Sequence, residues 1–193
     1  MKPRYLIALG SNVRHPRHGA PPAVLRAALK ALDGEKGIRL KAASRIVASA
    51  PLGPPNATAR RRYANAAAVV RSKLDPPELL VQLQGIEQGF GRRRLGQRWG
   101  ARTLDLDIVL WCGGAWVSPG LTIPHPAFRT RSFVLAPALA IARAWRDPLT
   151  GLTIAHLAAR LRRPRALVRT GEQTRLTPNA HTHRATIVPH GGP

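Results

Sequence analysis

The stretch Arg98-Trp-Gly-Ala-Arg-Thr-Leu-Asp-Leu-Asp-Ile-Val-Leu110 carries the strongest structural signal in this sequence of 193 residues. From Leu104 onward, apolar residues alternate with Asp105 and Asp107, which is the period of a half-buried strand. One set of alternate residues is Leu104, Leu106, Ile108 and Leu110, and the other set, expected on the opposite face, is Asp105, Asp107, Val109 and Trp111. Side chains two residues apart share one face of a strand, roughly 7 Å from each other. The pattern therefore predicts a strand that presents two carboxylates on one face.

These two carboxylates need a positive partner, and the rest of the sequence makes the pair unusual. The chain has nine acidic residues against 31 basic ones. Two like charges on one strand face are unfavourable unless a positive group lies between them, and either Arg102 or a metal ion would serve. Hard cations such as Mg²⁺ bind one or two carboxylates together with substrate phosphates. The stretch is therefore a candidate Mg²⁺–nucleotide site, with neighbouring arginines for phosphate oxygens.

Composition narrows the class of protein further. The formal net charge of +22 attracts polyanions, but the arginines are spread along the whole chain and no recognition helix, zinc finger or aromatic RNA-binding signature is present. We therefore expect nucleic acid only as a non-specific partner. The single cysteine, Cys112, excludes a disulfide framework. No apolar run has the length of a membrane span or a signal-peptide core, so we expect a cytoplasmic protein without a membrane partner.

Periodicity predicts the order of the elements. Residues 5–9, 38–46 and 63–70 read as strands in addition to the Asp-bearing one, while residues 22–32, 75–90, 134–142 and 154–161 read as helices. Asp75 and Glu78 have the spacing of a capping box, and Gly113-Gly114 indicates a hairpin turn. The order β-α-β-β-α-β predicts an α+β fold, with a ferredoxin-like βαββαβ sheet covered by helices on both sides in three layers. Residues 1–160 are expected to form this domain, and residues 161–193 a basic, flexible C-terminal tail.

Six segments in order carry a resemblance to a known family. They are Ala8-Leu-Gly-Ser-Asn12, Pro51-Leu-Gly53, Tyr63-Ala-Asn65, Ile86-Glu87, Arg98-Trp-Gly-Ala-Arg-Thr-Leu-Asp-Leu-Asp107 and Pro124-His125. Over residues 4 to about 145 the chain resembles the 6-hydroxymethyl-7,8-dihydropterin pyrophosphokinases of folate biosynthesis. The resemblance implies transfer of a pyrophosphoryl group from MgATP to the hydroxymethyl group of the pterin, with release of AMP, by a monomer. Ala50, Ala101 and Pro126 depart from the family's usual residues, all within loops.

The resemblance also implies roles for individual residues. Asp105 and Asp107 would hold two Mg²⁺ ions, and with Arg92 and Arg102 they form the catalytic set. The implied ATP-binding residues are Gln84, Arg92, Arg102, Ile108, Thr122, His125 and Arg131. The implied pterin-binding residues are Ser49, Leu52, Tyr63, Asn65, Trp99 and Phe133, with Trp99 and Phe133 on either side of the pterin ring. Glu87 matches a position near the same site.

Two other functions remain open from the residues. One is a nucleic-acid-binding protein built on a ferredoxin-like sheet, which would need exposed aromatic residues on the central strands; the predicted strands carry mostly Ala, Val and Leu. The other is a relative of the enzyme that binds ATP or pterin for a different purpose. Formation of AMP from ATP, with and without the hydroxymethyl pterin, separates the three functions.

Overall fold

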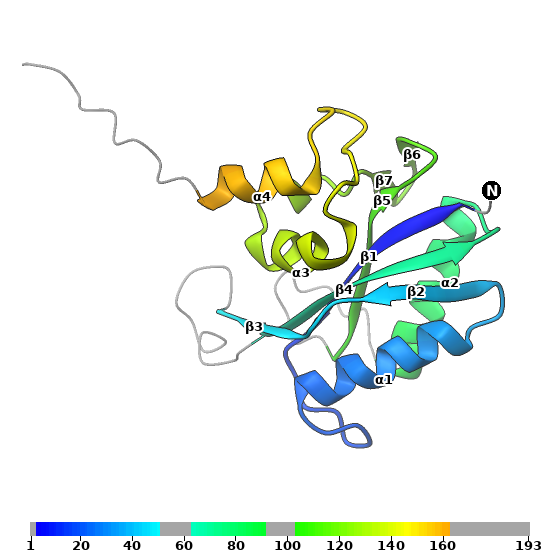
Figure 1. Ribbon diagram of the computed structural model, residues 1–193. Coiled ribbons are helices and arrows are strands. Elements are labelled where there is room, and N and C mark those ends of the chain that lie inside the picture. Colours follow the sequence, from blue (N-terminus) through cyan, green and yellow to red (C-terminus); the bar gives the residue numbers. More distant parts are fainter. Residues whose placement is uncertain (1–2, 51–62, 92–102, 163–193) are drawn as a thin grey trace, which may run out of the picture. The chain divides into compact units, whose positions relative to one another are not determined.

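A computed structural model describes residues 3–50, 63–91 and 103–162, all within one compact unit that spans Met1–Arg163. Four long strands form an antiparallel sheet in the order β2-β4-β1-β5, and the short strand β3 pairs with β4 (Figure 1). The strands are β1 (Arg4–Ser11), β2 (Ile38–Ala43), β3 (Val47–Ser49), β4 (Tyr63–Ser72), β5 (Asp105–Trp111), β6 (Trp116–Ser118) and β7 (Leu121–Ile123). The helices are α1 (Pro21–Gly34), α2 (Pro76–Gly89), the 3₁₀ helix η1 (Phe128–Thr130), α3 (Ser132–Ala142) and α4 (Ile154–Arg162). The predicted α+β class is confirmed.

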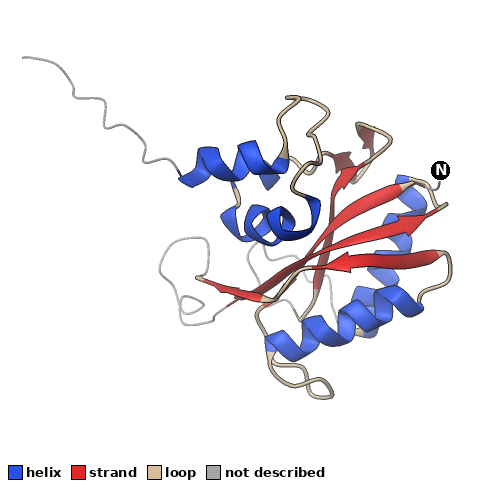
Figure 2. Ribbon diagram, viewed as in Figure 1, coloured by secondary structure: helices blue, strands red, loops and turns tan. Residues whose placement is uncertain are grey.

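Helices cover both faces of this sheet (Figure 2). On one face, Tyr5, Ile7 and Leu9 of β1 pack in a core with apolar residues of α1 and α2. On the other face, Leu6 packs in a second core with apolar residues of α3 and α4. The side chains of one strand therefore alternate between two separate cores, as period-two packing requires. No described helix has the length and apolar character needed to cross a membrane.

The predicted helices form, and the predicted start of α2 is confirmed in detail. The Asp75 carboxylate accepts a hydrogen bond from the backbone N–H of Glu78, and the Glu78 carboxylate accepts one from the backbone N–H of Asp75, each at 2.8 Å. This reciprocal pair satisfies two N–H groups that have no partner within the helix. The capping box thus fixes the residue at which α2 begins.

The predicted strand at residues 38–46 is shorter than expected: β2 ends at Ala43, and β3 begins only at Val47, beyond the predicted range. Ser44 lies at the break, where its backbone N–H donates to the Ala67 carbonyl and its hydroxyl accepts from the Ala67 N–H, each at 2.9 Å. The hydroxyl replaces a backbone acceptor, so the chain can bend without leaving an unpaired group on the central strand β4. The short hairpin of β6 and β7 was not predicted.

The predicted Asp-bearing strand is confirmed as β5, but its alternation fails near the end. Leu6 of β1 pairs with Leu110 and Ile7 pairs with Ile108, so β5 has one extra residue, Val109, between them. This bulge turns Leu110 to the face of the aspartates, where it joins the second core, and Trp111 to the opposite face. The expectation that Trp111 shares a face with Asp105 and Asp107 is therefore wrong.

Candidate active site

Two adjacent strands bring a carboxylate and an amide to the same place on one sheet face. In the antiparallel register Gly10 of β1 lies between Asp105 of β5 and Asn65 of β4. A methyl group on Gly10 would lie 3.9 Å from both the Asn65 Oδ1 and the Asp105 Cβ. Because Gly10 has no side chain, β1 itself places no group between the two polar side chains. This face is the one that α3 packs against.

Asp105 and Asp107 are both half-buried on this face, while Leu104, Leu106 and Ile108 point into the core behind them. The prediction of two carboxylates on one face of a strand is confirmed. Among the described residues no cluster of three or more His, Cys, Asp or Glu side chains could hold a metal alone. Two neighbouring carboxylates fit a hard divalent cation whose remaining ligands are water and substrate phosphate. The donor set therefore fits Mg²⁺ bound together with a nucleotide.

Asn65 is oriented by its neighbour on β3. Its Nδ2 donates to the Ser49 hydroxyl at 2.9 Å, and Ser49 pairs with Tyr63 across the two strands. Asn65 is only 4 % exposed, so this bond fixes the amide with its Oδ1 toward the space above Gly10. Ser49, Tyr63 and Asn65, three residues of the predicted pterin site, thus lie together at one end of the sheet.

Glu87 connects helix α2 to the Asp-bearing strand. Its side chain is 2 % exposed, and its Oε1 accepts a hydrogen bond of 2.7 Å from the backbone N–H of Leu106. Leu106 lies between Asp105 and Asp107 on β5, which is an edge strand of the sheet in the described part of the chain. Glu87 therefore holds the backbone that carries both aspartates.

His125 approaches β5 at the bulge. Its backbone N–H donates to the carbonyl of Val109, the extra residue, at 3.0 Å. Its Nδ1 accepts from the backbone N–H of Ala127 at 3.2 Å. In a neutral imidazole the other nitrogen, Nε2, then carries the proton and is the atom that can donate to a ligand oxygen.

The start of α3 brings together a cation and an aromatic ring of the predicted site. The Arg131 guanidinium lies 5.8 Å from the centre of the Phe133 ring, and both side chains are half-buried. Phe133 also packs against the core that lies below α3. The ring is therefore held partly by the core while one part remains accessible.

A buried ion pair anchors the segment between these two groups. Arg129 of η1 donates from Nε and Nη2 to both oxygens of Asp147, at 2.7 and 2.8 Å. Burial raises the pKa of the Asp147 carboxyl, but hydrogen bonds from Arg129, Thr150 and the Leu149 N–H outweigh it and leave the pKa below its usual value. The fully buried carboxylate thus stays charged and fixes η1 between His125 and Arg131.

Comparison with known families decides what this site belongs to. The family model of 7,8-dihydro-6-hydroxymethylpterin-pyrophosphokinase (HPPK) matches residues 6–143. The chain belongs to this family. The predicted class of enzyme, a pyrophosphokinase, is thereby confirmed.

Bacterial pyrophosphokinases are similar to this chain in sequence. A 2-amino-4-hydroxy-6-hydroxymethyldihydropteridine pyrophosphokinase of Synechocystis is 40% identical over 152 residues, which are 79% of this chain and 73% of that protein. The protein of the same name from Haemophilus influenzae is 43% identical over 136 residues, 70% of this chain and 79% of its own length. The assignment of this chain to the HPPK family therefore follows from sequence similarity and does not depend on the fold.

Solved structures support the fold. The crystal structure of wild-type Plasmodium falciparum HPPK-DHPS matches with a TM-score of 0.62 at 12% identity, over 83% of this chain. The chain spans only 41% of the length of that Plasmodium protein. At such low identity the match shows a shared HPPK-like architecture and nothing about individual side chains.

The predicted HPPK site residues fall into three groups. Those that the fold gathers on or beside the aspartate-bearing sheet face are Ser49, Tyr63, Asn65, Asp105, Asp107, His125, Arg131 and Phe133. Leu52, Arg92, Trp99 and Arg102 lie outside the described residues. Gln84 is half-buried on α2 and Thr122 is exposed on β7. The Ile108 side chain is 3 % exposed in the core on the opposite face, so only its backbone could contact ATP.

Three features of the HPPK site were not predicted from the sequence. They are the position of Gly10 between Asp105 and Asn65, the hydrogen bond from Leu106 to Glu87 and the Arg129–Asp147 pair. The rarity of acidic residues was a usable signal for the last, because Asp147 is one of only nine in the chain. Its partner could not be found without the fold.

Proposed function

We propose that the sheet face around Asp105, Gly10 and Asn65 binds MgATP and 6-hydroxymethyl-7,8-dihydropterin side by side and transfers pyrophosphate between them. The observation that carries this proposal is the row Asp105–Gly10–Asn65, in which a carboxylate and an oriented amide lie on either side of a residue without a side chain. The family's pyrophosphokinase reaction needs such a junction between a polyphosphate and a planar hydroxymethyl heterocycle.

Each side of the row has a role that the family resemblance implies and that its chemistry supports. Asp105 and Asp107 would hold two Mg²⁺ ions, which neutralise phosphate charge when bound and align the chain of phosphates. Arg92, Arg102, His125 and Arg131 would donate to phosphate oxygens, since the transition state of phosphoryl transfer is stabilised mainly by positive charge and position. The remaining ATP contacts would come from Gln84, Thr122 and the Ile108 backbone.

On the other side of Gly10, Asn65 would hydrogen-bond the edge of the pterin. Ser49 orients that amide, so Asn65 needs no rearrangement when the ligand arrives. Phe133 and Trp99 would stack on the two faces of the ring, and Tyr63 and the backbone near Leu52 would complete the pocket. The partial burial of Phe133 supports its part in this arrangement.

We further propose a ferredoxin-like topology for the domain, which would comprise residues 1–160 and act as a cytoplasmic monomer. The topology is supported by the strand order β2-β4-β1-β5, by the fully antiparallel pairing, and by the crossovers through α1 and α2. A nucleic-acid-binding function has little support, because among the aromatic residues of the central strands β1 and β4, Tyr5 is completely buried and Tyr63 is half-buried.

The deciding experiment measures AMP release from ATP by the full chain. We expect AMP to form only when 6-hydroxymethyl-7,8-dihydropterin and Mg²⁺ are both present, in a one-to-one ratio with the pterin diphosphate. EDTA should stop the reaction and added Mg²⁺ should restore it. AMP formation that is independent of the pterin, or binding of both ligands without any AMP, would refute the proposal.

A further inference from the structure

The end of the sheet face farthest from the aspartates carries a row of arginines. Arg4 of β1 pairs in register with Arg71 of β4, and Arg71 pairs with Arg39 of β2. Register partners on adjacent antiparallel strands point to the same face, with Cβ atoms about 5 Å apart. Arg4 lies four residues before Ala8, the register partner of Asp107, or about 13 Å along the strand. The row is therefore distinct from the candidate active site.

Within residues 3–50, 63–91 and 103–162, this row has no ion pair with an opposite charge. No carboxylate in the described part of the chain forms an ion pair with Arg4, Arg39 or Arg71, whereas Arg129 has Asp147. Like charges placed directly opposite each other across strands destabilise a sheet. A row of three such residues is thus a cost that a bound anion would remove.

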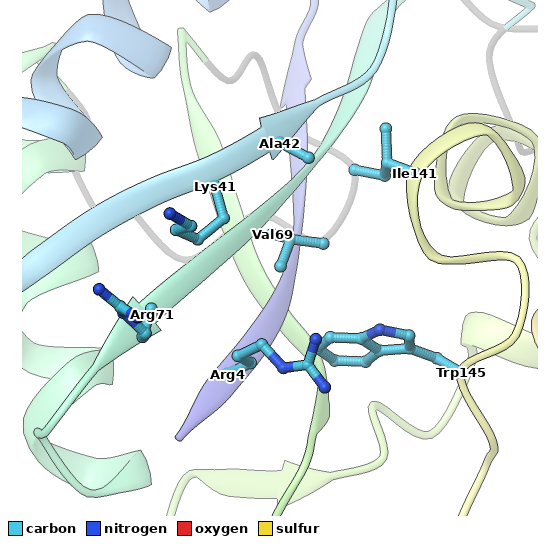
Figure 3. A pocket seen from close by; sticks show the side chains of 7 residues that line it. All are labelled: Arg4, Lys41, Ala42, Val69, Arg71, Ile141 and Trp145. Carbon is cyan, nitrogen blue, oxygen red and sulfur yellow. The ribbon is translucent and has the colours of Figure 1, made fainter. Parts of the chain in front are cut away.

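A cavity of about 540 Å³ lies at this row and adds an apolar wall to the charges. Its lining residues are Arg4, Lys41, Ala42, Val69, Arg71, Ile141 and Trp145. In Figure 3 the cationic ends of Lys41 and Arg71 lie on one side and Trp145 on the other, with Arg4 between them. The Arg4 guanidinium is 5.4 Å from the centre of the indole ring. The cavity thus has a charged side and an aromatic side, at a volume typical of small-ligand pockets, roughly 300–1,000 Å³.

We propose that this cavity is a second ligand site, which binds a phosphate-bearing planar heterocycle of nucleotide size. The guanidinium groups of Arg4 and Arg71 and the Lys41 ammonium bind the phosphate oxygens, for which bidentate arginine is well suited. The planar ring lies against Val69, Ile141 and Trp145. This site is independent of the proposed transfer reaction, because none of its residues belongs to the aspartate end.

The first test uses thermal unfolding of the full chain with Arg4→Gln and Arg71→Gln combined. Without ligand, the double variant should melt close to the temperature of the unmodified chain, because the loss of like-charge repulsion offsets the loss of the contact between Arg4 and Trp145. Pyrophosphate at ten times its dissociation constant should raise the Tm of the unmodified chain about 3 °C more than that of the variant. The matched control is Arg26→Gln with Lys30→Gln, which removes two exposed charges from α1 on the opposite face and should respond like the unmodified chain.

The second test follows the indole N–H resonance of Trp145, assigned by its loss in Trp145→Phe. AMP should shift it at lower concentration than pyrophosphate, adenosine only weakly, and neither AMP nor pyrophosphate should shift it in the arginine double variant. No shift with AMP, or an equal loss in the α1 control, would overturn the proposal. If AMP and pyrophosphate shift the resonance at equal concentrations, the proposed contact of the cavity with a planar heterocycle is refuted. If a short oligonucleotide binds more tightly at equal phosphate concentration, the ligand is a nucleic acid and not a small molecule.

Discussion

The two ends of one sheet face differ in charge, although the same strands build both. At one end, Asp105 and Asp107 are placed in a chain with only nine acidic residues. At the other end, Arg4, Arg39 and Arg71 stand in register on three adjacent strands. Between them, Leu6 of β1 pairs with Val69 of β4 and with Leu110 of β5, and this apolar row brings no charge.

This difference shows that side chains at the two ends of one sheet face are held in place to different degrees. The acidic end is held by hydrogen bonds, because Glu87 accepts one from the Leu106 backbone and Ser49 accepts one from Asn65. The cationic end has long, exposed side chains without ion pairs among the described residues. We infer that the acidic end is preorganised for one geometry, whereas the cationic end adapts to its ligand.

The largest expected effect is at the acidic end. Asp105→Asn and Asp107→Asn keep the size of each side chain but remove a metal-binding charge, so each should lower kcat by about 10³-fold or more. Both variants should still unfold cooperatively, and both should lose Mg²⁺-dependent binding of ATP in calorimetry. Glu35→Gln, which removes a carboxylate beyond the end of α1, is the control and should retain full turnover. A rate within tenfold of the unmodified enzyme in both aspartate variants would disprove the metal assignment.

The second prediction concerns the Arg129–Asp147 pair, which supports both ends. Its segment runs from His125 and Arg131 at the acidic end to the turn that follows Trp145. Asp147→Asn leaves the guanidinium without its charged partner, so the free energy of unfolding should fall by about 2–4 kcal/mol at pH 7. Urea titrations measure this change. The variant should also have lower activity and a shifted Trp145 indole N–H resonance. A change in only one of these two readouts would show that the pair does not link the acidic end to the cationic end.

The same pair predicts a pH dependence. Because the folded pKa of Asp147 is lowered, its stabilising contribution is complete above the unfolded value, roughly 4. That contribution is lost as the pH falls from there through the folded pKa. The stability difference between the unmodified chain and Asp147→Asn should therefore shrink on acidification below about pH 4. A difference that stays constant down to pH 2 would contradict the assigned direction of the shift.

These contrasts also show how far sequence reasoning reaches. The strands at residues 5–9, 63–70 and 105–111 were predictable because each has an uninterrupted alternation or a long apolar run, and α2 because its capping box is local. The hairpin of β6 and β7 was missed since each strand has three residues, too few to show a period. The bulge at Val109 was missed because an extra residue is visible only against the partner strand.

In the candidate site, too, some features could be found from the local sequence and others only from the fold. Asp105 and Asp107 were found from their spacing alone, whereas most other roles came from family resemblance. Contacts such as Ser49 with Asn65 and Arg129 with Asp147 join residues 16 and 18 positions apart through the fold. The arginine row depends on the register of three strands, which no single segment encodes.

The third prediction separates the two ligands at the acidic end. Asn65→Ala removes the amide proposed to read the pterin edge, while the aspartates and phosphate contacts remain. The KM for the pterin should rise about tenfold, as expected for one lost hydrogen bond of about 1–1.5 kcal/mol, and the KM for ATP should change little. Ser49→Ala, which only frees the amide, should give a smaller rise in the same direction. An equal rise for both ligands would place Asn65 outside the pterin site.

The smallest expected effect is at the cationic end. Arg39 belongs to the arginine row but does not line the cavity, so Arg39→Gln removes repulsion without removing a ligand contact. The Tm should rise by about 1–2 °C at low salt. Added salt screens exposed charges and should erase most of the gain. At the acidic end a neutralised charge costs turnover, whereas here it should leave turnover unchanged and favour folding. A lower Tm would mean that the arginines stabilise the sheet, which would remove the energetic reason for an anion at this end.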